Sequence, residues 1–249
     1  MNNSIRVIGL EGLGEIQPGN DLGAMIADAA RANGLKIGSG DVFVVAQKVV
    51  SKAEGRIVRL DTVTPSPMAC RWAEQHGKDP RVIEVVLGEA VRIVRMDRGI
   101  LIAETRHGFV CANAGVDSSN APPGIVTLLP LDCDRSAATL LVRLEAAFGV
   151  PLGVIVSDSF GRPWREGLVN VALGVAGVQP LIDCRGQQDS FGRTLRVTVI
   201  AVADELAGAA ELVMGKTRRI PVVVIQGADF RGEGVGRQLV RSAELDLFR

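Results

Sequence analysis

Short apolar runs and helical stripes of apolar residues alternate along the chain with polar and Gly-rich segments. Apolar runs of roughly four to eight residues indicate strands, and apolar residues spaced three and four apart indicate amphipathic helices. We expect strands at residues 5–10, 41–50, 100–104, 152–156, 195–202 and 220–225. We expect helices at residues 21–32, from Pro65, after Asp79-Pro80, and at residues 134–148 and 203–215, and an amphipathic tail with Leu239, Val240, Leu245 and Phe248.

Residues that cap helices support several of these elements. Asp21 precedes the first helix, Gly149 follows the helix at 134–148, and the pair Asp204-Glu205 opens another, where the helix dipole favours acidic side chains. Strands and helices alternate irregularly, and no linker of Gly, Ser or Pro divides the chain cleanly. We therefore expect a mixed α/β fold over residues 1–249, as a single unit or as a unit of two lobes.

Composition narrows the class of protein. Apolar residues make up 47% of the chain and charged residues 22%, which is typical of a compact enzyme. The 28 basic and 28 acidic residues balance, so we expect no nucleic-acid partner. Four separated cysteines and two histidines argue against a zinc site and favour a reduced, cytoplasmic compartment. We also expect no signal peptide and no membrane span.

Three polar or Gly-rich loops next to apolar strands carry candidate chemistry, at residues 12–16, at 47–52, and at 113–120 together with 156–165. Asp117 and Asp158 could hold Mg²⁺ with Ser159 as a neutral oxygen ligand, because hard cations prefer oxygen; both aspartates could instead cap turns. Lys48 and Lys52 follow a strand, where they could bind phosphate oxygens; alternatively, both are ordinary solvated charges. The chain has no Walker A motif.

The pentapeptide DSFGR occurs twice, at residues 158–162 and 189–193. The segments after the two copies differ, which excludes a repeat architecture. Of the two histidines, His76 lies in a helix stop signal and is expected to be structural, whereas His107 is a candidate for ligand contact.

Six ordered blocks together carry a resemblance to a known family. They read GLGEIQPGNDL, DVFVVAQKVVSKAEGRIV, HGFVCANAGVDSSN, VIVSDSFGRPWREG, DSFGRTLRVTVIAVADELA and ELVMGKTRRIPVVVIQG. From about residue 7 to 227 the chain resembles the coenzyme F420-0:gamma-glutamyl ligases. The resemblance implies a fold largely peculiar to that family, with mixed and antiparallel sheets, in an intertwined homodimer. Some members of that family carry a fused nitroreductase-like domain, which we do not expect in this chain.

The activity implied by this resemblance is a GTP- and divalent-metal-dependent ligation. L-glutamate would be added to coenzyme F420-0 through a γ-linked amide, via an acyl phosphate, with release of GDP and phosphate. The implied ions are Mg²⁺ or Mn²⁺, one or two per site, with K⁺ as a further candidate. The nucleotide would lie on Leu13, Gly14, Glu15, Ile16, Gln47, Lys48, Lys52 and Asn120. Asp117 and Asp158 would bind a first metal ion and Ser159 a second; no catalytic base is assigned.

The chain departs from the family pattern at three places. Gly14 stands where the family has a proline, Phe191 stands where it has a tyrosine, and the basic run 216–219 replaces acidic or Gly-rich residues. Two other functions compete with the ligase: a non-catalytic protein that binds deazaflavin or nucleotide, and a metal-dependent hydrolase of nucleoside triphosphates.

Overall fold

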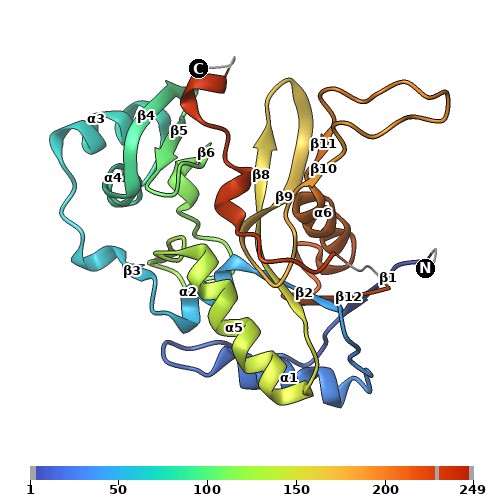
Figure 1. The fold of residues 1–249 in the computed structure, drawn as a ribbon. Helices are drawn as coiled ribbons and strands as arrows, with labels where there is room; N and C mark the ends of the chain where they lie inside the picture. Colours follow the sequence, from blue (N-terminus) through green and yellow to red (C-terminus); the bar gives the residue numbers. More distant parts are fainter. Residues whose placement is uncertain (1–3, 228–229, 247–249) are drawn as a thin grey trace.

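A five-stranded mixed sheet forms the centre of the protein in the computed structural model, which describes residues 4–227 and 230–246 (Figure 1). The strands, in spatial order, are β1 (Arg6–Gly9), β12 (Val222–Gln226), β2 (Val42–Ala46), β8 (Gly153–Arg162) and β9 (Arg165–Ala176). Only β2 and β8 pair in parallel; the other neighbours are antiparallel.

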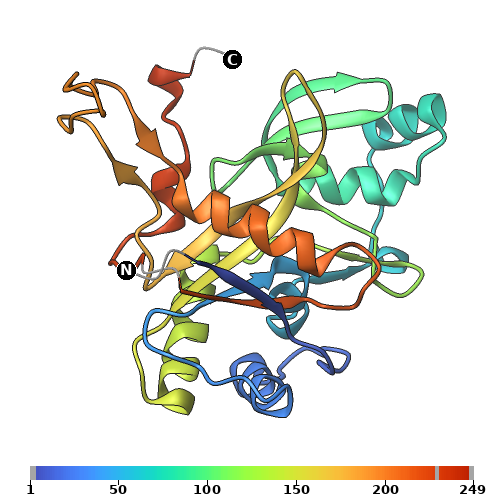
Figure 2. The same cartoon turned by 90° about the vertical axis from the view of Figure 1, so that its right-hand side faces the viewer.

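Helices cover both faces of this sheet. Successive side chains of a strand point to opposite faces, so Phe43 and Val45 pack against α1 (Leu22–Ala32) and α5 (Cys133–Phe148). Val44 points the other way, into the core formed with α6 (Val202–Met214). Figure 2 shows α6 lying along the sheet, with α1 and α5 on its other side.

A second apolar core lies beside the central sheet. Its elements are α3 (Pro67–His76), α4 (Pro80–Glu89), β4 (Ala90–Asp97), β5 (Ile100–Thr105) and β6 (Val110–Ala112). Buried side chains of Val86, Leu101 and Ala103 fill this core. The short strands β3 (Ile57–Arg59) and β7 (Ile125–Thr127) pair and pass between the two cores (Figure 1).

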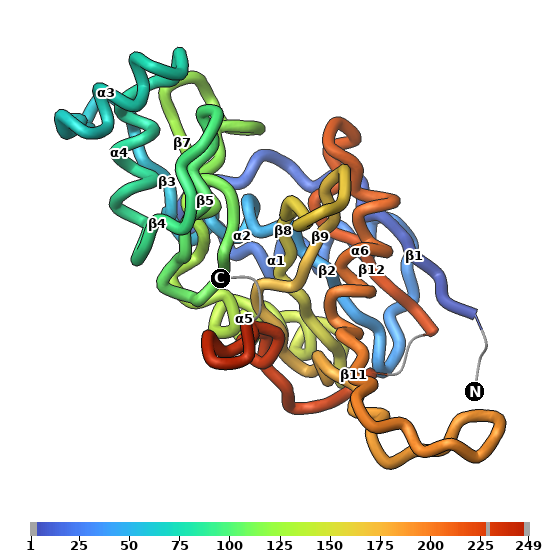
Figure 3. The backbone as a smooth tube through the Cα atoms, turned by 90° about the horizontal axis from the view of Figure 1, so that it is seen from above, coloured from blue at the N-terminus to red at the C-terminus, as the bar shows by residue number. Residues whose placement is uncertain are grey.

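An arm projects from the body between β10 (Ile182–Asp183) and β11 (Val199–Ile200). Residues 184–198 form its outer part, which Figures 1 and 3 show extending away from the central sheet. The chain then continues into α6.

Several predictions are confirmed. The Asp21 side chain accepts a hydrogen bond from the Ala24 N–H at 3.0 Å, and Gly149 ends α5 with a left-handed backbone. Asp204 and Glu205 lie in the first turn of α6. The mixed α/β class is also confirmed, with several mixed and antiparallel sheets. No helix among the described residues combines the length and apolar character that crossing a membrane requires.

The strand expected at residues 41–50 is wrong in its second half. The strand stops at Ala46, and α2 (Gln47–Ala53) begins at once. Gln47, Val50 and Ser51 are the buried residues of α2, spaced three and four apart as on a helix face. A short apolar run fits a strand and a buried helix equally well, so the pattern could not separate the two.

Three further expectations need correction. DSFGR at 158–162 is not a loop but part of β8, whose hairpin partner β9 was not predicted; β4 was also missed. The strand expected at 195–202 is reduced to β11, because the side chain of Val197 is 87% exposed and has no sheet to join. The tail forms two short 3₁₀ turns, Gly236–Leu239 and Ala243–Leu245, and Phe248 lies outside the described residues.

Candidate functional site

A cleft of about 750 Å³ opens where β2 passes into α2, next to β8 and the end of α6. The eight residues predicted to lie on the nucleotide all line it: Leu13, Gly14, Glu15, Ile16, Gln47, Lys48, Lys52 and Asn120. Asp158 and Ser159 also line it. Asp117 does not line the cleft, but one of its carboxylate oxygens lies 2.7 Å from Nζ of Lys48, which does. The structure thus brings together residues from distant parts of the chain.

Other lining residues escaped sequence reasoning. Ser157, Asn170 and Glu211 come from β8, β9 and α6. Ser157 and Asn170 are only 1% and 3% exposed. A polar residue inside an otherwise apolar run was the available signal, because buried polar groups need partners. Using that signal for Asn170 required recognising β9 first.

Two hydrogen-bond donors at the floor of the cleft lack partners among the described residues. Gln47 Oε1 accepts a hydrogen bond from Ser51 Oγ at 2.8 Å, but Gln47 Nε2 has no partner. The Ser157 hydroxyl has none either. Most buried polar side-chain atoms in proteins are hydrogen-bonded, and exceptions require an explanation. A polar ligand in the cleft would provide one.

The cleft has more basic than acidic side chains. Lys48, Lys52, Lys216 and Arg219 line it, against Glu15, Asp158 and Glu211. The Lys52 ammonium is 2.5 Å from Glu15 Oε1, and that of Lys48 is 2.5 Å from Ser119 Oγ. The Arg219 guanidinium has no hydrogen bond or ion pair within the part of the chain that the structure describes. This charge suits a polyanion such as a triphosphate.

Asp117 and Asp158 differ in how their charge is compensated. Burial acts to raise the pKa of Asp117, but hydrogen bonds from Lys48 and from the Ser119 N–H outweigh it and leave that pKa below its ordinary value. Burial raises the pKa of Asp158 to about 6; the Ser159 N–H and the charges of Lys48 and Lys216 oppose this shift, and the charge of Asp117 reinforces it. Asp158 is therefore a half-buried carboxylate whose neighbouring positive charges do not offset its loss of solvent.

These two carboxylates fit one divalent cation. Mg²⁺ is commonly held by one or two carboxylates together with substrate phosphates and water. Among residues 4–227 and 230–246, no cluster of three or more acidic, His or Cys side chains could hold an ion without a ligand's help. Asp117 and Asp158 would supply carboxylate oxygens, and a bound phosphate the rest. The under-compensated charge of Asp158 is the observation that favours a cation here.

Comparison with known proteins decides the family. The model of the F420-0:Gamma-glutamyl ligase family matches residues 12–227. The coenzyme F420:L-glutamate ligase of Methanothermobacter thermautotrophicus is 47% identical over 98% of this chain and 99% of its own length. That of Methanopyrus kandleri is 49% identical over 94% of each chain, and that of Archaeoglobus fulgidus is 41% identical over 98% and 96%. The chain belongs to the F420-0:gamma-glutamyl ligase family. The predicted resemblance is confirmed.

The segment shared with the F420-0:gamma-glutamyl ligase family contains the whole cleft. The lining residues run from Leu13 to Pro221, and the family match from 12 to 227. The cleft is thus built entirely from the part of the chain that carries the family relationship.

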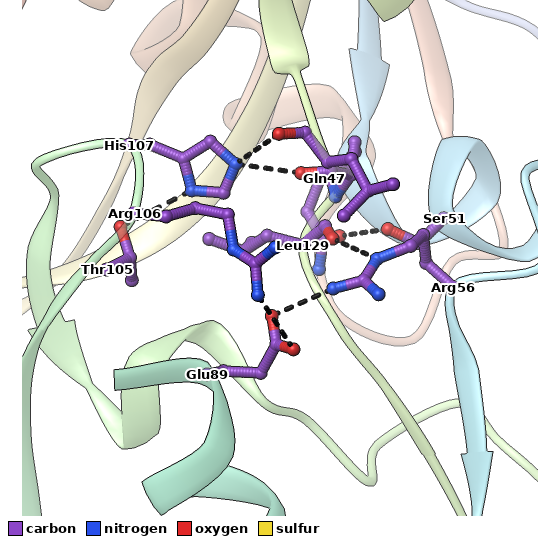
Figure 4. A network of polar contacts seen from close by, with 10 residues as sticks. Gln47, Ser51, Arg56, Glu89, Thr105, Arg106, His107 and Leu129 are labelled. Atoms are coloured by element: carbon purple, nitrogen blue, oxygen red, sulfur yellow. Dashed lines mark hydrogen bonds and ion pairs between the residues drawn. The ribbon is translucent and has the colours of Figure 1, made fainter. Parts of the chain in front are cut away.

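His107, the other candidate for ligand contact, lies outside this cleft. Its Nε2 is 2.8 Å from the Pro130 carbonyl oxygen and 3.2 Å from that of Leu131, and it borders a smaller cavity of about 310 Å³ (Figure 4). In the same view, Glu89 accepts hydrogen bonds from Arg56 and Arg106. This network joins the second core to the segment after α2. His76 ends α3 and contacts the ring of Trp72, as expected of a structural residue.

Proposed function

We propose that this chain joins the amine of L-glutamate to a carboxyl group of coenzyme F420-0 in an amide bond, with GTP as the phosphoryl donor and Mg²⁺ or Mn²⁺ in the site. Membership of the F420-0:gamma-glutamyl ligase family makes the chain an amide-bond-forming ligase of coenzyme F420 biosynthesis. The choice of GTP, the metal and the residue roles are the proposed parts. One observation supports them. A single cleft brings together basic side chains, the Asp158 carboxylate, whose negative charge is not offset by its neighbours, and buried hydrogen-bond donors that have no partner among the described residues.

The side chains of the cleft would divide the work of binding. Lys48 and Lys52 reach its interior and would hold the nucleotide phosphates, exchanging their contacts with Asp117 and Glu15 for phosphate oxygens. The buried amide of Gln47 would donate to the ligand. Asp117 and Asp158 would hold the divalent ion, which when bound neutralises charge on the phosphates. K⁺ stays a further candidate ion without an assigned ligand.

The reaction needs activation because a carboxylate does not condense with an amine unaided. A carboxylate oxygen of the acceptor attacks the γ-phosphorus of GTP, the bond to the β-phosphate oxygen breaks, and GDP leaves. The resulting acyl phosphate has a good leaving group. The glutamate amine attacks its carbonyl carbon, and the amide forms as phosphate departs. Fixed positive charge in the cleft favours the first step, because negative charge spreads over the transferring phosphoryl oxygens.

The test is mass spectrometry of coenzyme F420-0 incubated with the protein, L-glutamate, GTP and Mg²⁺ or Mn²⁺, each omitted in turn. A product heavier by one or more glutamyl units that requires every component supports the ligase. GTP consumption without coenzyme or glutamate would indicate a triphosphate hydrolase instead. Bound coenzyme with no turnover under any condition would indicate a binding protein. Two variants form a matched pair in this assay. Asp158→Asn, in the cleft, should lower product formation, and Asp61→Asn, at an exposed aspartate directly after β3, should not.

We further infer that the protein is a homodimer in which the arm of one copy docks on the other. Large apolar side chains are exposed on the arm: Phe191 is 88% and Val197 is 87% exposed. The outer part of the arm extends away from the central sheet (Figures 1 and 3). Exposed apolar residues grouped on one element are typical of interaction sites, and the resemblance implies an intertwined homodimer.

Light scattering tests the dimer. The unchanged protein should give the mass of two chains, and Phe191→Asp with Val197→Asp should give one. Val142→Asp, on an exposed apolar residue of α5, is the control and should leave the dimer intact. A single-chain mass for the unchanged protein would contradict the inference.

A further inference from the structure

Lys216 brings a positive charge into the cleft at Ser159, the residue that follows Asp158 in β8. Neighbouring side chains of a strand point in opposite directions, so the side chains of Asp158 and Ser159 leave β8 in different directions. Lys216 follows Gly215, directly after α6, and lines the cleft. Its ammonium donates a hydrogen bond to Ser159 Oγ and lies 3.9 Å from Glu211 Oε1.

The Ser159 hydroxyl makes two polar contacts in this arrangement, one as donor and one as acceptor. It lies 2.7 Å from Asn170 Oδ1 and donates its proton to that oxygen, because a carbonyl oxygen can only accept. The Asn170 amide nitrogen in turn points to Met214 Sδ at 4.0 Å, which is consistent with this orientation. One of the two lone pairs of Ser159 Oγ therefore accepts from Lys216. The ammonium thus occupies one of the two positions from which a metal ion would bind this oxygen.

The surrounding donors do not fit a second divalent ion. Ser159 is neutral, and the nearby carboxylate, Glu211, already faces Lys216. A divalent cation seeks roughly six oxygen ligands, preferably charged, and a fixed ammonium at the same oxygen would repel it. The second metal ion that the family resemblance implies at Ser159 thus meets a resident cation in this chain.

We propose that the Lys216 ammonium takes the place of the second divalent ion, so that each cleft binds a single divalent ion, at Asp117 and Asp158. The inference rests on the proposed function, because it assumes a nucleotide and a metal ion in this cleft. Lys216 would contact the phosphates next to Ser159, while the metal ion would contact them at the two aspartates. Arg219, also in the cleft and unpaired among the described residues, extends the same positive surface.

Counting bound Mn²⁺ tests this without relying on activity. Mn²⁺ is titrated by calorimetry into protein saturated with guanosine 5′-(β,γ-imido)triphosphate, and the bound ions are counted by electron paramagnetic resonance. The unchanged protein should bind one Mn²⁺ per chain. Lys216→Glu, which replaces the ammonium with a carboxylate, should bind two close enough to broaden each other's resonance. Adding Ser159→Ala to that variant should return the count to one.

Arg218→Glu is the matched control, with the same change of charge two positions away. Arg218 donates to carbonyls at the end of α6 and does not line the cleft, so its variant should still bind one ion. If Lys216→Glu fails to fold, Lys216→Gln removes the charge and should admit a second, weaker ion. Two Mn²⁺ in the unchanged protein would overturn this inference but not the proposed function. A single Mn²⁺ in a folded Lys216 variant that binds nucleotide would do the same. Binding of neither nucleotide nor Mn²⁺ would overturn the proposed function as well.

Discussion

Residues 158–162 and 189–193 share the sequence DSFGR but differ in structure. In the first copy the five residues form the outer half of β8 and pair with β9, and Asp158 and Ser159 line the cleft. In the second they form an exposed turn on the arm. Asp189 Oδ1 accepts hydrogen bonds from the N–H groups of Phe191 and Arg193, both at 2.9 Å.

The difference shows what the surroundings add to a short sequence. An aspartate in a turn satisfies nearby N–H groups with its own side chain, and Asp189 does so in water. Asp158 lies in a strand paired with β9, and the contact from the Ser159 N–H does not offset the burial of its carboxylate. Burial then makes that carboxylate costly unless a cation joins it. The same residue stabilises a turn in one place and creates a binding site in the other.

Activity should separate the two aspartates most strongly. Asp158→Asn removes a carboxylate from the proposed ion site, and we expect turnover of coenzyme F420-0 to fall roughly a thousandfold, the effect of several kcal/mol in the transition state. Asp189→Asn keeps an oxygen for both N–H groups and should stay within about twofold. Product formation is followed by mass spectrometry. Equal losses in the two variants would mean that the arm also enters the site.

The same substitution that lowers activity, Asp158→Asn, should raise the stability of the metal-free protein. Asp158 has a folded pKa of about 6 against an ordinary value near 3.8, so its ionisation opposes folding by up to about 3 kcal/mol at pH 7. Asp158→Asn should therefore raise the free energy of unfolding of the metal-free protein, and Asp189→Asn should leave it within about 0.5 kcal/mol. Urea denaturation in the presence of a chelator measures both.

The sign of this effect has a pH signature. Between about pH 4 and pH 6 the unfolded chain releases the Asp158 proton while the folded chain retains it, so rising pH destabilises the unchanged protein relative to Asp158→Asn. The advantage of the variant should vanish near pH 4 and be complete above pH 6. An advantage that does not vary with pH would show that burial of charge is not its cause.

The sequence predicted the fold where local pattern and tertiary structure agree. The helices α1 and α5 follow from apolar spacing and from caps such as Asp21 and Gly149. At Gln47 the pattern could not decide, because a helix continues a strand within one apolar run. The run that contains Val197 indicated a strand, but no sheet covers it. Local residues do not reveal which apolar runs find a partner.

The candidate site could be predicted only in part for a related reason. Residues of the cleft were named from the family resemblance and from polar loops, and the structure brings them together. The contact of Lys216 with Ser159 joins residues 57 positions apart and depends on how α6 packs against β9. Asn170 lies in a strand that was not predicted at all. Pairing over such distances comes from the folded chain.

The glycines of the two copies offer the smallest and most local comparison. A methyl group added at Gly161 or at Gly192 would meet no atom within 4 Å, so crowding does not distinguish them. Their backbones do, because Gly192 has φ of 77° and Gly161 does not have a left-handed φ. Residues with a side chain lose roughly 1–2 kcal/mol in the left-handed region. Gly192→Ala should therefore loosen its turn, and Gly161→Ala should leave β8 unchanged.

Hydrogen exchange of single amides resolves an effect of this size. The N–H groups of Phe191 and Arg193 bond to Asp189 and report on the turn. In Gly192→Ala they should exchange about tenfold faster, the factor that corresponds to about 1.4 kcal/mol. In Gly161→Ala the amides of β8 and the turn should both exchange as in the unchanged protein. Faster exchange in β8 alone would mean that the first copy, not the second, depends on its glycine. The irregular strand pairing between Gly161 and Arg162 would then be the constraint on the backbone.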